Sequence, residues 1–180
     1  MFAGPFFFDT SAESWFSRTD DPRALDWMRH YLSGHQVQIS AVTVLERVRG
    51  YSLLWRRAEP DGRGRIEAAR IAYLQGLGRV WPIDAATAVV AAEIMALLPN
   101  PPTPPRRSHR LAESHPERLA RWRFDGLIAA TALVAGMPLI HNNAADFETI
   151  RTGIECAPER FPRLGSLQLL RCTSLSGSYS

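Results

Sequence analysis

The chain has 180 residues and a formal net charge of +3, with the composition of a soluble globular protein and enough length for one domain with a substantial core. No apolar run is long enough to span a membrane, and the apolar first residues lack the basic start of a signal peptide, so we expect a cytoplasmic protein. Cys156 and Cys172 do not form a C-x-x-C motif. This argues against a disulfide framework or a zinc site and favours reduced, half-buried thiols.

The basic residues of the chain are all arginine, and there is no lysine. Arginine suits bidentate contacts with phosphates and stacking on bases, although coding bias is an alternative explanation. The charge is also unevenly distributed, because six arginines lie between residues 106 and 123. That segment is the most basic part of the sequence.

Short apolar runs alternate with helical patterns along the first half of the chain. The predicted elements are strand 6–8, helix 22–32, strand 37–39, helix 41–58, helix 65–77, strand 80–83 and helix 85–98. Asp9 follows the first strand, where the chain is expected to enter a loop. Residues 59–64 are rich in proline and glycine and predict a turn-rich linker. Glu46 lies early in a helix capped by Ser40, where an exposed surface ion pair is the simplest interpretation of this residue alone.

The second half of the chain contains the most informative stretch. Proline-rich residues 99–107 predict an extended spacer, and residues 111–122 a short basic helix packed loosely on the body. Asp125 is expected at the start of an almost uncharged helix that Gly136 ends. The remaining predictions are strand 139–141, a break at 142–143, a short helix to residue 150, strand 167–172 and a disordered tail at 173–180.

This alternation of strands and helices predicts an α/β fold with a mainly parallel sheet, in which ligands bind beyond the carboxyl ends of the strands. Asp9 follows the first strand and Asp146 the fourth, so the two carboxylates converge if those strands are neighbours. Glu46 and Asp125 are expected near helix starts on the same side of the sheet. Four carboxylates at one edge repel each other unless cations compensate, and oxygen ligands favour magnesium or manganese.

Four segments resemble a known family in their order and spacing. They are similar to the PIN-domain ribonucleases, and most closely to the VapC-type toxin of type II toxin–antitoxin pairs: F-F-F-D-T-S, I-S-A-V-T-V-L-E-R-V-R-G-Y, D-G-L-I-A-A-T-A-L-V-A-G-M-P-L-I and N-N-A-A-D-F. The resemblance extends from residue 6 to about residue 172. It implies a single PIN-like domain over residues 1–172, with three layers, a central sheet flanked by helices, and a basic insertion at about 99–123.

The resemblance also implies the site and its chemistry. The implied catalytic residues are Asp9, Glu46, Asp125 and Asp146, of which Asp9, Asp125 and Asp146 bind the metal. Ser11 and Asn143 match the family's supporting polar residues. The implied activity is Mg²⁺- or Mn²⁺-dependent hydrolysis of RNA phosphodiesters without a side-chain nucleophile. The implied partners are RNA, a cognate antitoxin protein and a second copy of the chain.

Two other functions remain open from the sequence. The first is a catalytically silent, PIN-like binding module, against which the intact set of four carboxylates argues. The second is a metal-dependent phosphohydrolase acting on DNA or small phosphate esters, for which the same carboxylates would serve.

The chain departs from the family's pattern in two places. His141 stands where these toxins usually have a small hydroxyl residue; it suits phosphate or water binding, but a structural role at the strand end is preferred. The insertion at 99–123 replaces a short connection. Its arginines suit an RNA-binding arm, and the alternatives are a solvated basic face or a surface that docks the antitoxin. The arginines proposed for RNA binding are Arg106, Arg107, Arg110 and Arg121.

Overall fold

The central element is a five-stranded sheet, and a computed structural model describes it within residues 4–102, 114–162 and 164–172. The strands are β1 (Phe7–Phe8), β2 (Gln38–Ser40), β3 (Arg79–Trp81), β4 (Leu139–His141) and β5 (Leu169–Arg171). Their order across the sheet is β3-β2-β1-β4-β5, and each neighbouring pair is parallel. The predicted α/β class with a parallel sheet is therefore confirmed.

Seven α-helices and one short 3₁₀-helix connect the strands in the described part of the chain. They are α1 (Thr10–Phe16), α2 (Pro22–Leu32), α3 (Ala41–Arg57), α4 (Pro60–Gln75), α5 (Ala85–Leu97), α6 (His115–Ala135), α7 (Ala144–Cys156) and η1 (Pro158–Arg160). No helix among the described residues is both long enough and apolar enough to cross a membrane. Cys156 is exposed, Cys172 is buried, and both are free.

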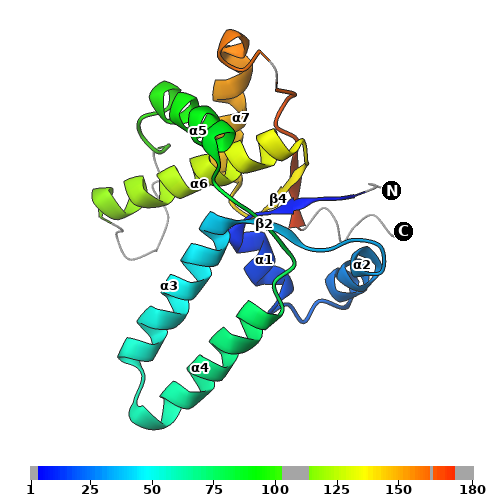
Figure 1. Ribbon diagram of the computed structural model, residues 1–180, viewed down its shortest axis with the longest axis vertical. Helices are drawn as coiled ribbons and strands as arrows, with labels where there is room; N and C mark the ends of the chain where they lie inside the picture. Colours follow the sequence, from blue (N-terminus) through cyan, green and yellow to red (C-terminus); the bar gives the residue numbers. More distant parts are fainter. Residues whose placement is uncertain (1–3, 103–113, 163, 173–180) are drawn as a thin grey trace.

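Alternating side chains of the short strands build a hydrophobic core on each face of the sheet. On one face, Phe7 and Leu139 pack in a cluster with residues of α5, α6 and α7. On the other face, Phe8 and Ile140 pack with residues of α1 and α2. The result is the expected three-layer arrangement, and Figure 1 shows α5, α6 and α7 gathered on one side of the strands.

The helices α3 and α4 form a hairpin that extends away from the two cores (Figure 1). None of the residues of α4 is buried. The Arg63 guanidinium lies 4.5 Å from the ring centroid of Trp55, so part of the hairpin's packing is a cation–π contact at its far end. Because the hairpin buries so little surface, its orientation depends on a small number of contacts at its base.

Two predictions for the first half of the chain were wrong. The loop expected after Asp9 is a helix, α1, and Asp9 is its N-cap, accepting a hydrogen bond from the backbone N–H of Ala12. Residues 59–64 were expected to form a linker, but α4 begins at Pro60. Proline is favoured in the first turn of a helix because its missing N–H has no helical partner there, so the turn signal was a helix start.

A third prediction was wrong in the second half. The basic helix expected at 111–122 and the apolar helix expected after Asp125 are one helix, α6, so Asp125 lies in a helix interior. A capping box formed by Ser114 and Glu117 starts α6. Trp122 is buried and its Nε1 donates to the Leu98 carbonyl oxygen at 2.8 Å, which fixes the basic half of α6 to the body.

The C-terminal boundaries also differ in detail. Helix α7 continues to Cys156, six residues beyond the predicted end at 150, and Gly136 adopts the predicted left-handed cap with a φ of 65°. The tail at 173–180 and residues 103–113 of the predicted insertion lie outside the described part of the chain.

Candidate active site

Asp9 lies at the carboxyl end of β1, in the middle of the sheet. Its side chain is almost fully buried and accepts hydrogen bonds from Ser11 Oγ at 2.7 Å and from the Ala12 backbone N–H at 2.6 Å. Both donors are neutral groups of the first turn of α1. The Ser11 hydroxyl also accepts a bond from the Asn142 backbone N–H at 3.1 Å, which joins the loop after β4 to the start of α1.

The loop after β4 brings a second pair of carboxylates together. Asn143 precedes α7, and its Nδ2 donates to Asp146 Oδ2 at 2.6 Å and to Asp125 Oδ2 at 3.1 Å. Asp146 lies in the first turn of α7, whereas Asp125 reaches the site from the interior of α6. Because β4 pairs directly with β1, this loop and Asp9 share one edge of the sheet.

Glu46 approaches the same edge from α3. Its carboxylate accepts a short hydrogen bond from Thr10 Oγ1, in the residue that directly follows Asp9. An exposed surface ion pair was the simplest interpretation of Glu46 from sequence, but Glu46 is partly buried, and its neighbour Arg47 pairs with Glu13 of α1. Glu46 therefore faces the first turn of α1, beside the other acidic residues.

Burial and mutual repulsion set the protonation of this site. The pKa of Asp9 is raised to about 7, mainly by burial. The hydrogen bonds from Ala12 and Ser11 oppose this rise, and the charge of Glu46 adds to it. Burial also raises the pKa of Asp125 well above its usual range, followed by the charges of Asp146, Asp9 and Glu46. The charges of the other three predicted carboxylates therefore all act on Asp125, and that of Glu46 also acts on Asp9.

The chemistry of the site suits a hard divalent cation. Its donor groups are carboxylate and amide oxygens, and a cation would relieve the repulsion that raises the pKa of Asp9 and Asp125. Within the described ranges, however, no three histidine, cysteine, aspartate or glutamate side chains are arranged to hold a metal ion. The side-chain amide of Asn143 bridges Asp125 and Asp146 in this arrangement. The residues thus fit a cation in type and charge. In this structure the amide of Asn143, a neutral donor, holds Asp125 and Asp146 in place.

His141 has the environment of a core residue. It is fully buried against the ring of Phe147, with ring centroids 5.2 Å apart, and within the described residues neither ring nitrogen has a hydrogen-bond partner. Burial lowers its pKa to about 4, so the imidazole is neutral at physiological pH. This environment favours the structural interpretation of His141 over phosphate or water binding.

Two residues near the site were missed by sequence reasoning. Thr10 belongs to the F-F-F-D-T-S segment, but no role was expected for it, and only its position beside Asp9 could have indicated one. Arg49 is exposed on α3, three residues after Glu46, and with Arg121 of α6 its charge lowers the pKa of Glu46, although burial has the larger, opposite effect. Arg106, Arg107 and Arg110 lie outside the described residues.

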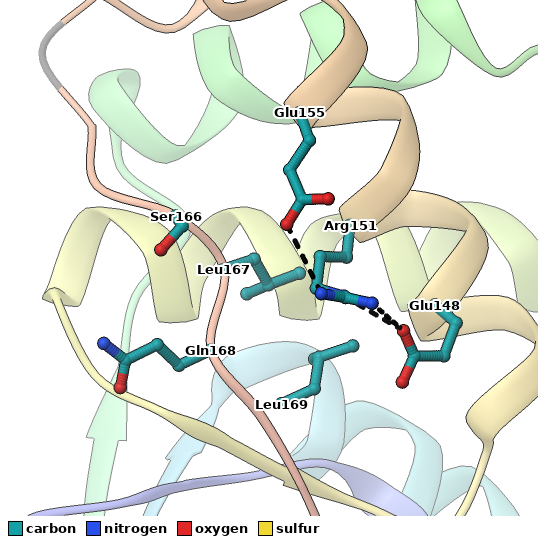
Figure 2. Close-up of a pocket in the computed structure, with 7 residues that line it drawn as sticks. All are labelled: Glu148, Arg151, Glu155, Ser166, Leu167, Gln168 and Leu169. Carbon is teal, nitrogen blue, oxygen red and sulfur yellow. Dashed lines mark hydrogen bonds and ion pairs between the residues drawn. The ribbon is translucent and has the colours of Figure 1, made fainter.

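A separate cavity of about 390 Å³ lies between α7 and the segment leading into β5. Figure 2 shows Arg151 in this cavity, between Glu148 and Glu155. Its guanidinium is 2.7 Å from Glu148 Oε2 and 3.4 Å from Glu155 Oε1. Because the two carboxylates already neutralise this guanidinium and none of the four predicted carboxylates lines the cavity, we assign it no part in the chemistry.

Comparison with known proteins bears on the fold of the chain. The sequence profile of the PIN domain matches residues 6–152. DNA-bound VapBC from Salmonella typhimurium has a TM-score of 0.57 at 17% identity, covering 93% of this chain and 97% of that chain. VapBC2 from Rickettsia felis has a TM-score of 0.57 at 14% identity, covering 92% of this chain and 97% of that chain. FitAcB from Neisseria gonorrhoeae has a TM-score of 0.56 at 19% identity, covering 94% of this chain and 99% of that chain. These likenesses show the fold; no curated protein matches the sequence.

We expect Asp125→Asn to stabilise the metal-free protein at high pH. Because the pKa of Asp125 is raised on folding, the folded state binds the proton of this carboxyl more tightly than the unfolded state. The stability that the bound proton contributes is present near pH 4 and is lost as the pH rises through the raised pKa. At pH 8 in EDTA the variant should gain on the order of 1 kcal/mol or more in unfolding free energy, and the gain should shrink towards pH 4. Thermal unfolding followed by circular dichroism measures this.

Asparagine retains an oxygen acceptor for the amide of Asn143, so the substitution removes charge with little change of shape. The matched control is Asp26→Asn, because Asp26 is exposed on α2 and pairs only with Arg29 among the contacts described for it. Its substitution should change stability little at either pH. A lower melting temperature of Asp125→Asn at pH 8 would contradict the electrostatic account.

Proposed function

The chain belongs to the PIN domain family, and from this membership we propose that it is an Mg²⁺- or Mn²⁺-dependent endoribonuclease, the toxin of a toxin–antitoxin pair. One observation carries the proposal: four carboxylates from four different elements meet at the carboxyl edge of a parallel sheet, where burial and mutual charge raise the pKa of Asp9 and Asp125. Buried carboxyl groups with raised pKa values are typical of functional sites, which supports a use for this cluster.

Each acidic residue has a proposed role. Asp9, Asp125 and Asp146 would hold the metal, which supplies Lewis acidity toward the scissile phosphate and an activated water. Glu46 has a pKa raised mainly by burial and suits the transfer of a proton at the edge of the site. Ser11 and Asn143 orient the aspartates through the hydrogen bonds that they donate.

The basic residues beside the site support a nucleic-acid substrate. Arg49 and Arg121 act electrostatically on Glu46 from two different helices, so positive charge flanks the acidic edge. Such charge attracts the phosphates that the acidic centre would otherwise repel. The preference for RNA over DNA or a small phosphate ester rests on the resemblance to VapC-type toxins, because the carboxylates themselves serve any of these substrates.

The proposed partners follow from the similar structures, which are VapBC and FitAcB assemblies. We propose a cognate antitoxin protein and a homodimer for this chain. Exposed apolar side chains support both: Ile71 and Leu74 on α4, a helix without a buried residue, and Val89 on α5, which is 64% exposed. Neighbouring apolar side chains that stay exposed on a helix without buried residues, such as α4, are typical of surfaces that a partner covers.

Cleavage of a mixed RNA pool by the purified protein tests the activity. We expect cutting with Mg²⁺ or Mn²⁺ and none with EDTA. Asp9→Asn should reduce the rate at least about 100-fold, because it removes a charge that would hold the metal while an asparagine oxygen can still cap α1. Asp20→Asn, an exposed residue ahead of α2, is the control and should cut normally.

Each outcome of that assay separates the proposal from its alternatives. Metal-dependent cutting that persists in Asp9→Asn would point to a contaminating nuclease. A folded wild-type protein that binds Mn²⁺ but cuts only DNA or small esters would indicate the phosphohydrolase. A folded protein that neither binds metal nor cuts any of these substrates would indicate a binding module.

Neutralising the basic flank should weaken substrate binding more than catalysis. We expect Arg49→Gln combined with Arg121→Gln to raise KM about 3- to 10-fold with kcat nearly unchanged, and to flatten the fall of kcat/KM with salt, because two fewer phosphate contacts release fewer counterions. Cleavage measured from 50 to 200 mM salt tests this. The control is Arg23→Gln, exposed on α2. An unchanged salt slope in the double variant would remove these arginines from the substrate path.

A further inference from the structure

The side chain of Arg47 connects α3 to α1 through two polar contacts. Its Nε lies 3.0 Å from Glu13 Oε2, and its Nη1 donates to Ser14 Oγ at 3.1 Å. The Nε–Oε2 contact is an ion pair rather than a well-directed hydrogen bond, since neither atom has a hydrogen-bond partner among the residues that the structure describes. Both charged side chains are largely removed from solvent, with exposed fractions of 18% for Arg47 and 13% for Glu13.

The Arg47 guanidinium also packs on aromatic rings. It lies 5.5 Å from the ring centroid of Tyr51 on α3 and 5.1 Å from that of Tyr73 on α4. The two rings are themselves 5.9 Å apart. Arg47 therefore joins three helices in one cluster, the Arg47 cluster, whose members are Glu13, Ser14, Arg47, Tyr51 and Tyr73.

The energetics of the Glu13–Arg47 pair indicate a geometric role rather than a large gain in stability. Burial raises the pKa of Glu13, and the nearby charges of Arg47 and Arg18 oppose that rise without cancelling it. Desolvation thus offsets much of the attraction between the two charges, as is usual for buried ion pairs. The pair instead fixes the distance and orientation of α3 relative to α1.

The Arg47 cluster lies immediately beside the acidic edge. Glu13 and Ser14 follow Thr10 by three and four residues on α1, so all three lie on one helical face, and Arg47 directly follows Glu46. The hydrogen bond from Thr10 to Glu46 and the contacts of Arg47 with α1 therefore occupy adjacent turns of the same α1–α3 seam. Figure 1 shows α1 beside the base of α3, with the hairpin extending beyond it.

We propose that Arg47 is a positioning residue, which holds the base of the α3–α4 hairpin against α1 and so places the Glu46 carboxylate over the first turn of α1, next to Asp9. This inference rests on the proposed function for its effect on cleavage. The polar contacts of Arg47 with α1 are to Glu13 and Ser14, away from the proposed metal ligands. Arg47 is therefore not a catalytic residue; its effect on cleavage comes from where it places Glu46.

The test compares Arg47→Met with Arg47→Lys. Methionine keeps most of the apolar stem without the charge, and we expect kcat to fall about 10- to 100-fold with little change in KM, because a displacement of about 1 Å at a catalytic group has effects of this size. Lysine keeps the charge but lacks the planar fork that reaches Glu13 and Ser14 together, so it should recover only part of kcat. The control is Arg56→Met, exposed near the end of the same helix.

A second measurement does not depend on activity. Backbone hydrogen exchange should increase in α3 and α4 of Arg47→Met, while α5, α6 and α7 keep wild-type protection. Wild-type kcat in Arg47→Met, or unchanged exchange in the hairpin, would overturn the proposal. If the wild-type protein does not cleave RNA, the proposed function fails, and the exchange comparison still decides whether Arg47 positions the hairpin.

Discussion

The parallel pairing of β1 with β4 is the constraint on which the site depends. These two strands are adjacent in the sheet although some 130 residues separate them in sequence, and their register aligns Phe8 with Ile140. In a parallel pair both chains leave the sheet at the same edge. The pairing of the two strands therefore brings Asp9 and residues 143–146 to one place. The contact from the Asn142 backbone N–H to Ser11 then joins the two departing loops.

The acidic edge costs the fold stability, and the surrounding contacts limit that cost with neutral donors. The hydroxyl of Ser11, the amide of Asn143 and the N–H of Ala12 all donate to aspartates. Such bonds orient a carboxylate, but they do not remove the cost of its burial or the repulsion between neighbouring charges, so the pKa of Asp9 and of Asp125 stays high, mainly because both groups are buried. A cation bound here would favour the charged form of both carboxyls and displace the protons that their raised pKa values retain.

Sequence reasoning located the carboxylates better than the elements that carry them. Asp9 and Asp146 could be placed because short apolar runs mark strands and the chain leaves a parallel sheet at a defined edge. Asp125 was expected at a helix start, because the uncharged segment after it contrasts sharply with the arginines before it. That contrast reflects burial instead: the apolar half of α6 packs in the core, and the basic half extends beyond it. Helix α1 was missed because seven residues carry too little periodicity to be recognised.

The contacts between side chains of different elements were beyond sequence reasoning, and Glu46 illustrates the reason. Glu46 lies close to Arg47 and Arg49 on the same predicted helix. Opposite charges this close in sequence suggest an exposed ion pair on the helix surface. Arg47 turns instead to Glu13, and Glu46 turns to Thr10, because α1 packs across the base of α3. Glu46 is also the one member of the four carried by the projecting hairpin, while Asp9, Asp125 and Asp146 belong to elements fixed by the two cores. The completeness of the acidic edge therefore depends on the α1–α3 seam, the least extensively packed of the connections that position its members.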